Sequence, residues 1–207
     1  MEYILFLHDA EPIGEGGWRV CYHHPLDPDK CIKVDRIPNK MSVTIKEVRL
    51  LKRFYSRGVS FDLITRYYGQ VKTDKGPGYI FRLVRDYDGR ISRSVQYYLE
   101  KKNETAIPED LSQGLIELKR FMLSEGIIVG MLEDHNMLYQ YIASGKGRVV
   151  LVDGVGNHQF LPVANFFKSA ARRVLKRKWK TFECQLLSDY GHNEHVVRIV
   201  ENIRGAC

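Results

Sequence analysis

The sequence lacks a long apolar run and lacks any cysteine arrangement typical of a metal site. No stretch approaches the roughly 18 apolar residues of a membrane-spanning helix. The 4 cysteines form no CxxC pair and no cluster with zinc spacing, so we expect free thiols in a reducing cytoplasm. The N-terminal segment MEYILFLHDAEP has neither the basic region nor the long apolar region of a secretory signal, which favours a first β-strand.

Acidic residues are missing from one segment near the C-terminus. The formal net charge is +7, from 32 Lys and Arg against 25 Asp and Glu. Seven cations lie between Lys168 and Lys180 with no acid among them, and they equal the whole excess. Apolar residues at helical spacing in the same segment predict a basic amphipathic helix near residues 165–182. Its cations are either solvated or bind an anionic membrane surface, and the absence of a nucleic-acid-binding motif disfavours nucleic acid.

The hydrophobic pattern changes along the chain from short alternating runs to longer helical ones. A hydrophobic content of 44% supports a packed core. Strands dominate the first part, with one helix around residues 45–55 and a strand pair joined by the turn DKGPG. Helices dominate the rest, notably from Pro108 to about Ser124 with Gly126 as its end, and the strand VVLVD interrupts them. We therefore predict one α+β domain with a β-rich N-lobe over residues 1–85 and a helical C-lobe over residues 86–207.

Five polar or glycine features occur along this pattern, and each has an ordinary structural explanation when taken alone. A glycine-rich turn suits a hairpin, a strand lysine can extend to solvent, and a helix glutamate suits a solvated face. A loop asparagine can cap a turn, and Asp-Gly is a common turn dipeptide. The residues concerned are Gly14, Gly16, Gly17, Lys33, Glu47, Asn136 and Asp153.

The order of these features resembles that of the functional parts of a protein kinase. In such a kinase a glycine-rich loop covers the ATP phosphates, and a strand lysine paired with a helix glutamate binds them. The resemblance therefore implies that Lys33 binds phosphates and Glu47 orients it. It also implies that Asn136 and Asp153 bind Mg²⁺, with the sequence DGVG in place of the usual DFG.

Several longer motifs are similar to those of one bacterial family. IGEGGWRVCYHHP followed by CIKV, and later GPGYIF, DYDG, NML and DGVG, resemble the YrbL family, small kinase-like proteins of the PhoP regulatory network. The resemblance covers about residues 11–165 and implies a protein-kinase-like fold with a shortened C-lobe. The segment YIFRLVRDYDG falls where a kinase hinge contacts adenine, which makes Asp86 a candidate nucleotide-binding residue.

The sequence departs from the kinase pattern in the catalytic loop. Kinases carry a base aspartate five residues before the asparagine, in HRDxxxxN, but Met131 occupies that position here. Asp134 is the first candidate for a relocated base and His135 the second. Only about a dozen residues separate Asp153 from the predicted basic helix, so a small or lipid-linked acceptor suits the chain as well as a protein does.

The sequence thus predicts a cytoplasmic kinase-like protein that binds ATP and Mg²⁺ in a cleft between its lobes. If it is active, it transfers phosphate to a hydroxyl acceptor. One alternative is a catalytically inactive regulatory pseudokinase that binds a partner. Another is a sugar or lipopolysaccharide-core kinase located peripherally at the inner membrane.

Overall fold

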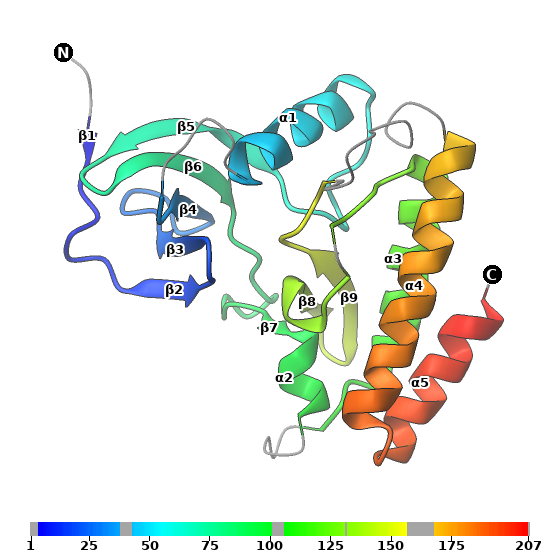
Figure 1. Cartoon of the computed structure of the whole chain (residues 1–207). Coiled ribbons are helices and arrows are strands. Elements are labelled where there is room, and N and C mark those ends of the chain that lie inside the picture. The colour runs from blue at the N-terminus through cyan, green and yellow to red at the C-terminus, as the bar shows by residue number, and fades with distance from the viewer. Residues whose placement is uncertain (1–3, 38–42, 101–105, 131, 157–167, 207) are drawn as a thin grey trace. The chain divides into compact units, whose positions relative to one another are not determined.

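The chain folds into two compact units. The computed structural model describes residues 4–37, 43–100, 106–130, 132–156 and 168–206 (Figure 1). Met1–Phe61 and Thr65–Val84 form the sheet unit, and Asp62–Ile64 and Arg85–Cys207 form the helical unit. The predicted α+β class is confirmed. The sequence had put the change of pattern after residue 85, and the chain passes into the helical unit after Val84.

In the part of the sheet unit that the structure describes, there are a six-stranded sheet and one helix, α1 (Val43–Ser56). The sheet order is β1-β5-β6-β4-β3-β2, with β1 parallel to β5 and the other pairs antiparallel. Leu5, Leu7, Ile32 and Val34 form one apolar cluster of this unit, with Ile32 and Val34 on the same face of β4. The strands are β1 (Ile4–Leu5), β2 (Pro12–Glu15), β3 (Arg19–His23), β4 (Lys30–Asp35), β5 (Tyr67–Thr73) and β6 (Gly76–Arg82).

The described residues of the helical unit form a small antiparallel sheet, β7-β8-β9, and four α-helices. Helix α3 packs on β9, and Gly114 allows this close approach: a Cβ there would lie 3.0 Å from Cγ2 and 3.2 Å from the backbone N of Val149. The strands are β7 (Arg93–Ser94), β8 (Met137–Ala143) and β9 (Lys146–Leu151). The helices are α2 (Val95–Leu99), α3 (Leu111–Glu125), α4 (Lys168–Tyr190) and α5 (Glu194–Gly205), with a short 3₁₀ helix, η1 (Asp134–Asn136).

Two predicted helices differ in extent from the observed ones. The predicted basic helix ended near residue 182, whereas α4 continues to Tyr190 because Leu186 extends the buried stripe of Trp179 and Phe182 by another turn. Helix α3 begins three residues after Pro108 and ends as expected at Gly126, whose φ of 70° is the left-handed conformation that suits glycine. None of the described helices is long and apolar enough to cross a bilayer.

A buried ion pair joins three helices of the helical unit. The Lys119 Nζ of α3 lies 3.0 Å from Oε1 of Glu183 in α4 and donates a hydrogen bond to the Ile203 carbonyl of α5 at 2.9 Å. Both side chains are 6% exposed, so either charge alone would be strongly destabilising there. The pair therefore sets how the three helices pack.

We expect Lys119→Met to lower the free energy of unfolding by about 3–5 kcal/mol, because it leaves the Glu183 carboxylate buried without its main partner. Urea denaturation measures this change. Lys180→Met, on the exposed side of α4, is the control and should change stability by no more than about 0.5 kcal/mol. The double variant Lys119→Met with Glu183→Leu should recover much of the loss. A double variant as unstable as the single one would contradict this account.

Candidate functional site

The glycine-rich turn predicted at residues 14–17 is a hairpin between β2 and β3. The N–H of Gly16 donates to the carbonyl of Arg19 at 2.9 Å, which closes the turn. Gly14, Gly16 and Gly17 all have φ values outside the left-handed region. A Cβ would meet nothing within 4 Å at Gly14 or Gly17, and only a carbonyl at 3.7 Å at Gly16. Neither backbone conformation nor packing of the described residues requires glycine here, which leaves room for a group from outside the chain.

Lys33 lies in the middle of β4 and is buried, with an exposed fraction of 7%. Its Nζ stands 4.6 Å from the ring centre of Phe81 on the neighbouring strand β6. Burial lowers the pKa of Lys33, as does the positive charge of Arg19, while the charge of Glu47 opposes this shift. Lys33 therefore belongs to the same buried charged cluster as Glu47 and does not extend into solvent.

Glu47, on α1, is 1% exposed rather than on a solvated helix face. Its Oε2 accepts a hydrogen bond from Nη1 of Arg19 at 2.7 Å, and the same nitrogen lies 3.1 Å from Oγ1 of Thr44. The other oxygen, Oε1, is buried and accepts no hydrogen bond from the described residues. Thr44 in turn donates to Asp35 at 2.5 Å, which adds a half-buried carboxylate at the margin of the cluster.

Arg19 is the functional candidate that sequence reasoning did not select. In the kinase pattern that the sequence resembles, the third loop glycine would fall at this position, and the Arg19 side chain is 8% exposed. In the antiparallel register of β3 with β4, Cys21 is the cross-strand partner of Lys33. Arg19 lies two residues from Cys21 on the same strand, so its side chain is on the same face of the sheet as Lys33. The available sequence signal was a charged residue within the short strand RVCYH.

Asn136 and Asp153 lie at adjacent ends of two paired strands in the helical unit. Asn136 ends η1 just before β8, and Asp153 follows β9 by two residues. The N–H of Val152 donates to the Asn136 carbonyl at 2.9 Å, which brings the two chain segments together. Gly154 has a φ of 77°, the left-handed conformation that suits glycine, and its backbone nitrogen lies 2.5 Å from the Asp153 carboxylate.

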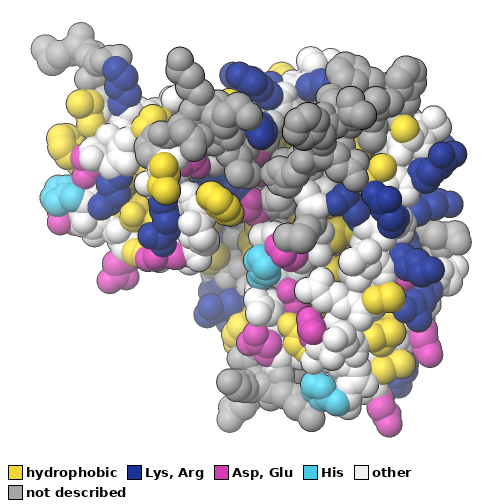
Figure 2. All heavy atoms as spheres, in the orientation of Figure 1, with side chains coloured by type: hydrophobic (Ala, Val, Ile, Leu, Met, Phe, Trp, Pro, Cys, Tyr) yellow, Lys and Arg dark blue, Asp and Glu magenta, His cyan; other side chains and the backbone are white. Residues whose placement is uncertain are grey.

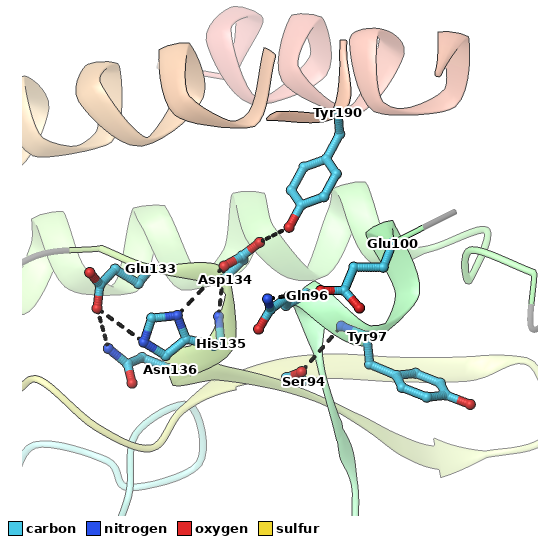
Figure 3. Close-up of polar contacts among 9 residues, drawn as sticks. All are labelled: Ser94, Gln96, Tyr97, Glu100, Glu133, Asp134, His135, Asn136 and Tyr190. Atoms are coloured by element: carbon cyan, nitrogen blue, oxygen red, sulfur yellow. Dashed lines mark hydrogen bonds and ion pairs between the residues drawn. The ribbon is translucent and has the colours of Figure 1, made fainter. Parts of the chain in front are cut away.

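The residues before Asn136 form a compact polar group (Figure 3). Oε2 of Glu133 accepts a hydrogen bond from the amide nitrogen of Asn136 at 3.0 Å and lies 3.2 Å from Nε2 of His135. Oδ2 of Asp134 accepts a hydrogen bond at 2.7 Å from the hydroxyl of Tyr190, at the end of α4. Burial and this carboxylate raise the pKa of Tyr190. Asp134, the first candidate base, thus already has a partner, and Met131 lies outside the described residues.

Asp86 fastens the DYDG turn to β8. Its carboxylate accepts hydrogen bonds from the Ser92 hydroxyl at 2.6 Å and from the Tyr141 N–H at 3.0 Å, and its exposed fraction is 9%. The segment predicted as a hinge contains the passage from the sheet unit to the helical unit, between Val84 and Arg85. The Asp86 side chain therefore has a structural role, which is to hold the DYDG turn against β8.

The oxygen donors near Asn136 suit magnesium better than a transition metal. The described residues contain no group of three or more His, Cys, Asp and Glu side chains that could hold a metal ion. Mg²⁺ is bound through one or two protein oxygens together with waters and substrate phosphates, so it does not need such a group. Donation of the Asn136 amide nitrogen to Glu133 directs its Oδ1 elsewhere, and this oxygen with the Asp153 carboxylate would form a fitting pair.

Comparison with known proteins identifies the family. A family model described as PhoP regulatory network protein YrbL matches residues 5–187. Relatives from Escherichia coli (strain K12) and Shigella flexneri, both named "Uncharacterized protein YrbL", are 31% identical over 186 residues, which is 88% of this chain and 88% of each relative. The chain belongs to the YrbL family, as its motifs had indicated.

We expect Lys33→Met to raise the free energy of unfolding near neutral pH. The folded-state pKa of Lys33 is lowered from 10.5, so the unfolded chain binds more protons between the two values and stability rises with pH across that window. Lys33→Met should remove this rise, since Arg19 remains as the partner of Glu47.

Urea denaturation from neutral pH to about pH 10 would measure this effect. Lys46→Met, at an exposed position of α1, is the matched control and should leave the pH dependence unchanged. Arg19→Met should instead lower stability by about 3 kcal/mol, because it removes the hydrogen-bonded partner of a buried carboxylate. If Lys33→Met destabilises as much as Arg19→Met, Lys33 is a structural residue.

Proposed function

We propose that this protein is kinase-like: it binds ATP with Mg²⁺ and transfers the γ-phosphoryl group to a hydroxyl acceptor. The observation that carries the proposal is the buried cluster of Arg19, Lys33 and Glu47 beside a glycine hairpin, with the two cations on paired strands and Glu47 on α1. Such a cluster costs folding free energy through desolvation, and a role in holding phosphate would explain why it is retained. The glycines, which the described residues do not require, support the same reading.

The arrangement of elements also supports a kinase-like fold. The glycine hairpin, the lysine strand, the glutamate helix and two further strands follow one another in the sheet unit. In the helical unit, a two-stranded hairpin separates the loop asparagine from the strand-end aspartate. This is the order that the kinase pattern requires of its lysine, glutamate, asparagine and aspartate.

Each residue has a separate task in this proposal. Lys33 neutralises phosphate oxygens, and the backbone N–H groups of the glycine hairpin approach them where no Cβ intervenes. Glu47 positions Lys33 electrostatically while bonded to Arg19. Asn136 and Asp153 would hold Mg²⁺, which when bound neutralises the charge of the transferring phosphoryl group.

A second candidate is a regulatory pseudokinase that binds ATP without transferring phosphate. Two observations favour it. Met131 cannot accept a proton at the position of the usual base. Asp134, the nearest candidate to replace that base, accepts the hydroxyl of Tyr190. Loss of a general base typically costs about 10²–10⁴-fold in rate, which permits slow transfer as well as none.

ATP with Mg²⁺ should stabilise the protein against thermal unfolding. A ligand that binds only the native state adds about 2.7 kcal/mol at a hundredfold excess over Kd. Asp153→Asn should remove the magnesium-dependent part of this gain, and Lys33→Met should weaken the effect of ATP with or without magnesium. Asp189→Asn, which removes a carboxylate from an exposed position of α4, is the charge-matched control and should behave as wild type. Stabilisation by neither ATP nor any other purine nucleotide would contradict the proposal.

Single-turnover ATP consumption distinguishes the enzyme from the pseudokinase. If Asp134 is a relocated base, Asp134→Asn should lower the rate by about 10²-fold while ATP binding is retained. Tyr190→Phe is the matched control, because it removes the partner of Asp134 but keeps the carboxylate. His135→Gln tests the other candidate, and Met131→Asp should raise the rate by restoring the usual base. Binding of ATP by all variants with consumption by none would establish the pseudokinase.

A further inference from the structure

A group of exposed cations lies on α4, outside the residues assigned to ATP. Figure 2 shows Lys and Arg side chains along the upper part of this helix. Five exposed cations are concerned, and no acidic residue occurs in the helix before Glu183. They are Arg172, Arg173, Lys176, Arg177 and Lys180.

None of these five cations forms an ion pair with a carboxylate of the described residues. Some exposed cations elsewhere do pair, as Arg36 does with Glu15 and Arg90 with Asp88. The segment 157–167 that precedes α4 contains no acidic residue in its sequence, so it supplies no counter-charge. The positive charge of this face is therefore available to an external anion.

The apolar side of α4 is not available for insertion into a membrane. Five of its apolar residues are at most 2% exposed and form part of the core of the helical unit. They are Ala171, Leu175, Trp179, Phe182 and Leu186. Insertion of these residues into lipid would require this core to open. Any binding of a membrane by the helix therefore depends on its cations.

Two of these cations, Arg172 and Lys176, line a hollow between α4 and α3 together with Arg120 of α3. A pocket of about 290 Å³ is lined by Arg120, Leu123 and Ser124 of α3 and by Arg172 and Lys176 of α4. Nε of Arg172 donates to the Leu123 carbonyl at 3.2 Å. This bond holds the guanidinium at the pocket wall and leaves its two terminal nitrogens for another acceptor.

We propose that Arg120, Arg172 and Lys176 form a binding site for a phosphate-bearing anion. Three like charges converging on one hollow repel each other, and a bound dianion would relieve that repulsion. Guanidinium groups bind phosphate oxygens through paired hydrogen bonds, and the ammonium of lysine adds a point charge. The volume lies just below the usual range of about 300–1,000 Å³ for small-molecule pockets, which favours a compact group.

Two sources could present this group, a free small anion or the headgroup of an anionic lipid. Binding of pyrophosphate, measured by titration calorimetry, tests the first source. Flotation with vesicles of phosphatidylcholine, with or without phosphatidic acid, tests the second. The triple variant Arg120→Gln, Arg172→Gln, Lys176→Gln removes the site. The triple variant Arg173→Gln, Arg177→Gln, Lys180→Gln removes the same charge from α4 residues that do not line the pocket, and is the matched control.

We expect saturable binding of one pyrophosphate or capture by phosphatidic acid vesicles, weakened at least tenfold by the first triple variant and less than threefold by the control. Equal weakening by both variants would overturn the proposal, since binding would then follow net charge alone. Absence of binding to either probe would also overturn it. The single variant Lys176→Gln, with its fold checked by circular dichroism, guards against unfolding and should show an intermediate loss.

The Lys33→Met variant separates this site from the proposed ATP site. Pyrophosphate binding that persists in Lys33→Met and disappears in the first triple variant belongs to the α3–α4 pocket. Binding that disappears in Lys33→Met and persists in the triple variant belongs to the sheet unit and overturns the assignment to this pocket.

Discussion

The buried ion pair between Arg19 and Glu47 constrains the candidate site of the sheet unit. It joins β3 to α1 across 28 residues of sequence, and it holds the glutamate inside the unit at an exposed fraction of 1%. Burial of two charges is costly unless their hydrogen-bonding groups are satisfied, and Thr44 contributes to that by contacting Arg19. The lowered pKa of Lys33 follows from this arrangement, because burial and the nearby Arg19 both disfavour its charged form.

The helical unit uses carboxylates mainly to fasten chain segments. Asp110, before α3, accepts the Tyr139 hydroxyl and the Gly147 N–H, which ties the helix to the β8–β9 hairpin. Asp86 ties the preceding turn to β8 in a similar way. Asp134 connects η1 to the end of α4 through Tyr190. A carboxylate in a loop is therefore not by itself a sign of catalysis here, and Asp153 is distinguished by its place beside Asn136 at the strand ends.

Local pattern allowed much of the fold to be anticipated. Helical spacing of leucines in α3 and the glycine after it located that helix to within three residues, because both signals act within a few turns. The partners of the site residues could not be anticipated in this way: Asp134 and Tyr190 are 56 residues apart, and nothing near either one indicates the other.

The sequence by itself determined the YrbL family, the α+β class, the positions of the candidate residues and the surplus of cations after residue 167. These depend on residue identity and on periods of two or 3.6 residues, which are local properties. Only the tertiary structure decided that Glu47 is buried against Arg19, and that Arg120 lines the same hollow as Arg172 and Lys176. Strand register and helix packing bring such residues together, and both arise from burial of side chains distant in sequence.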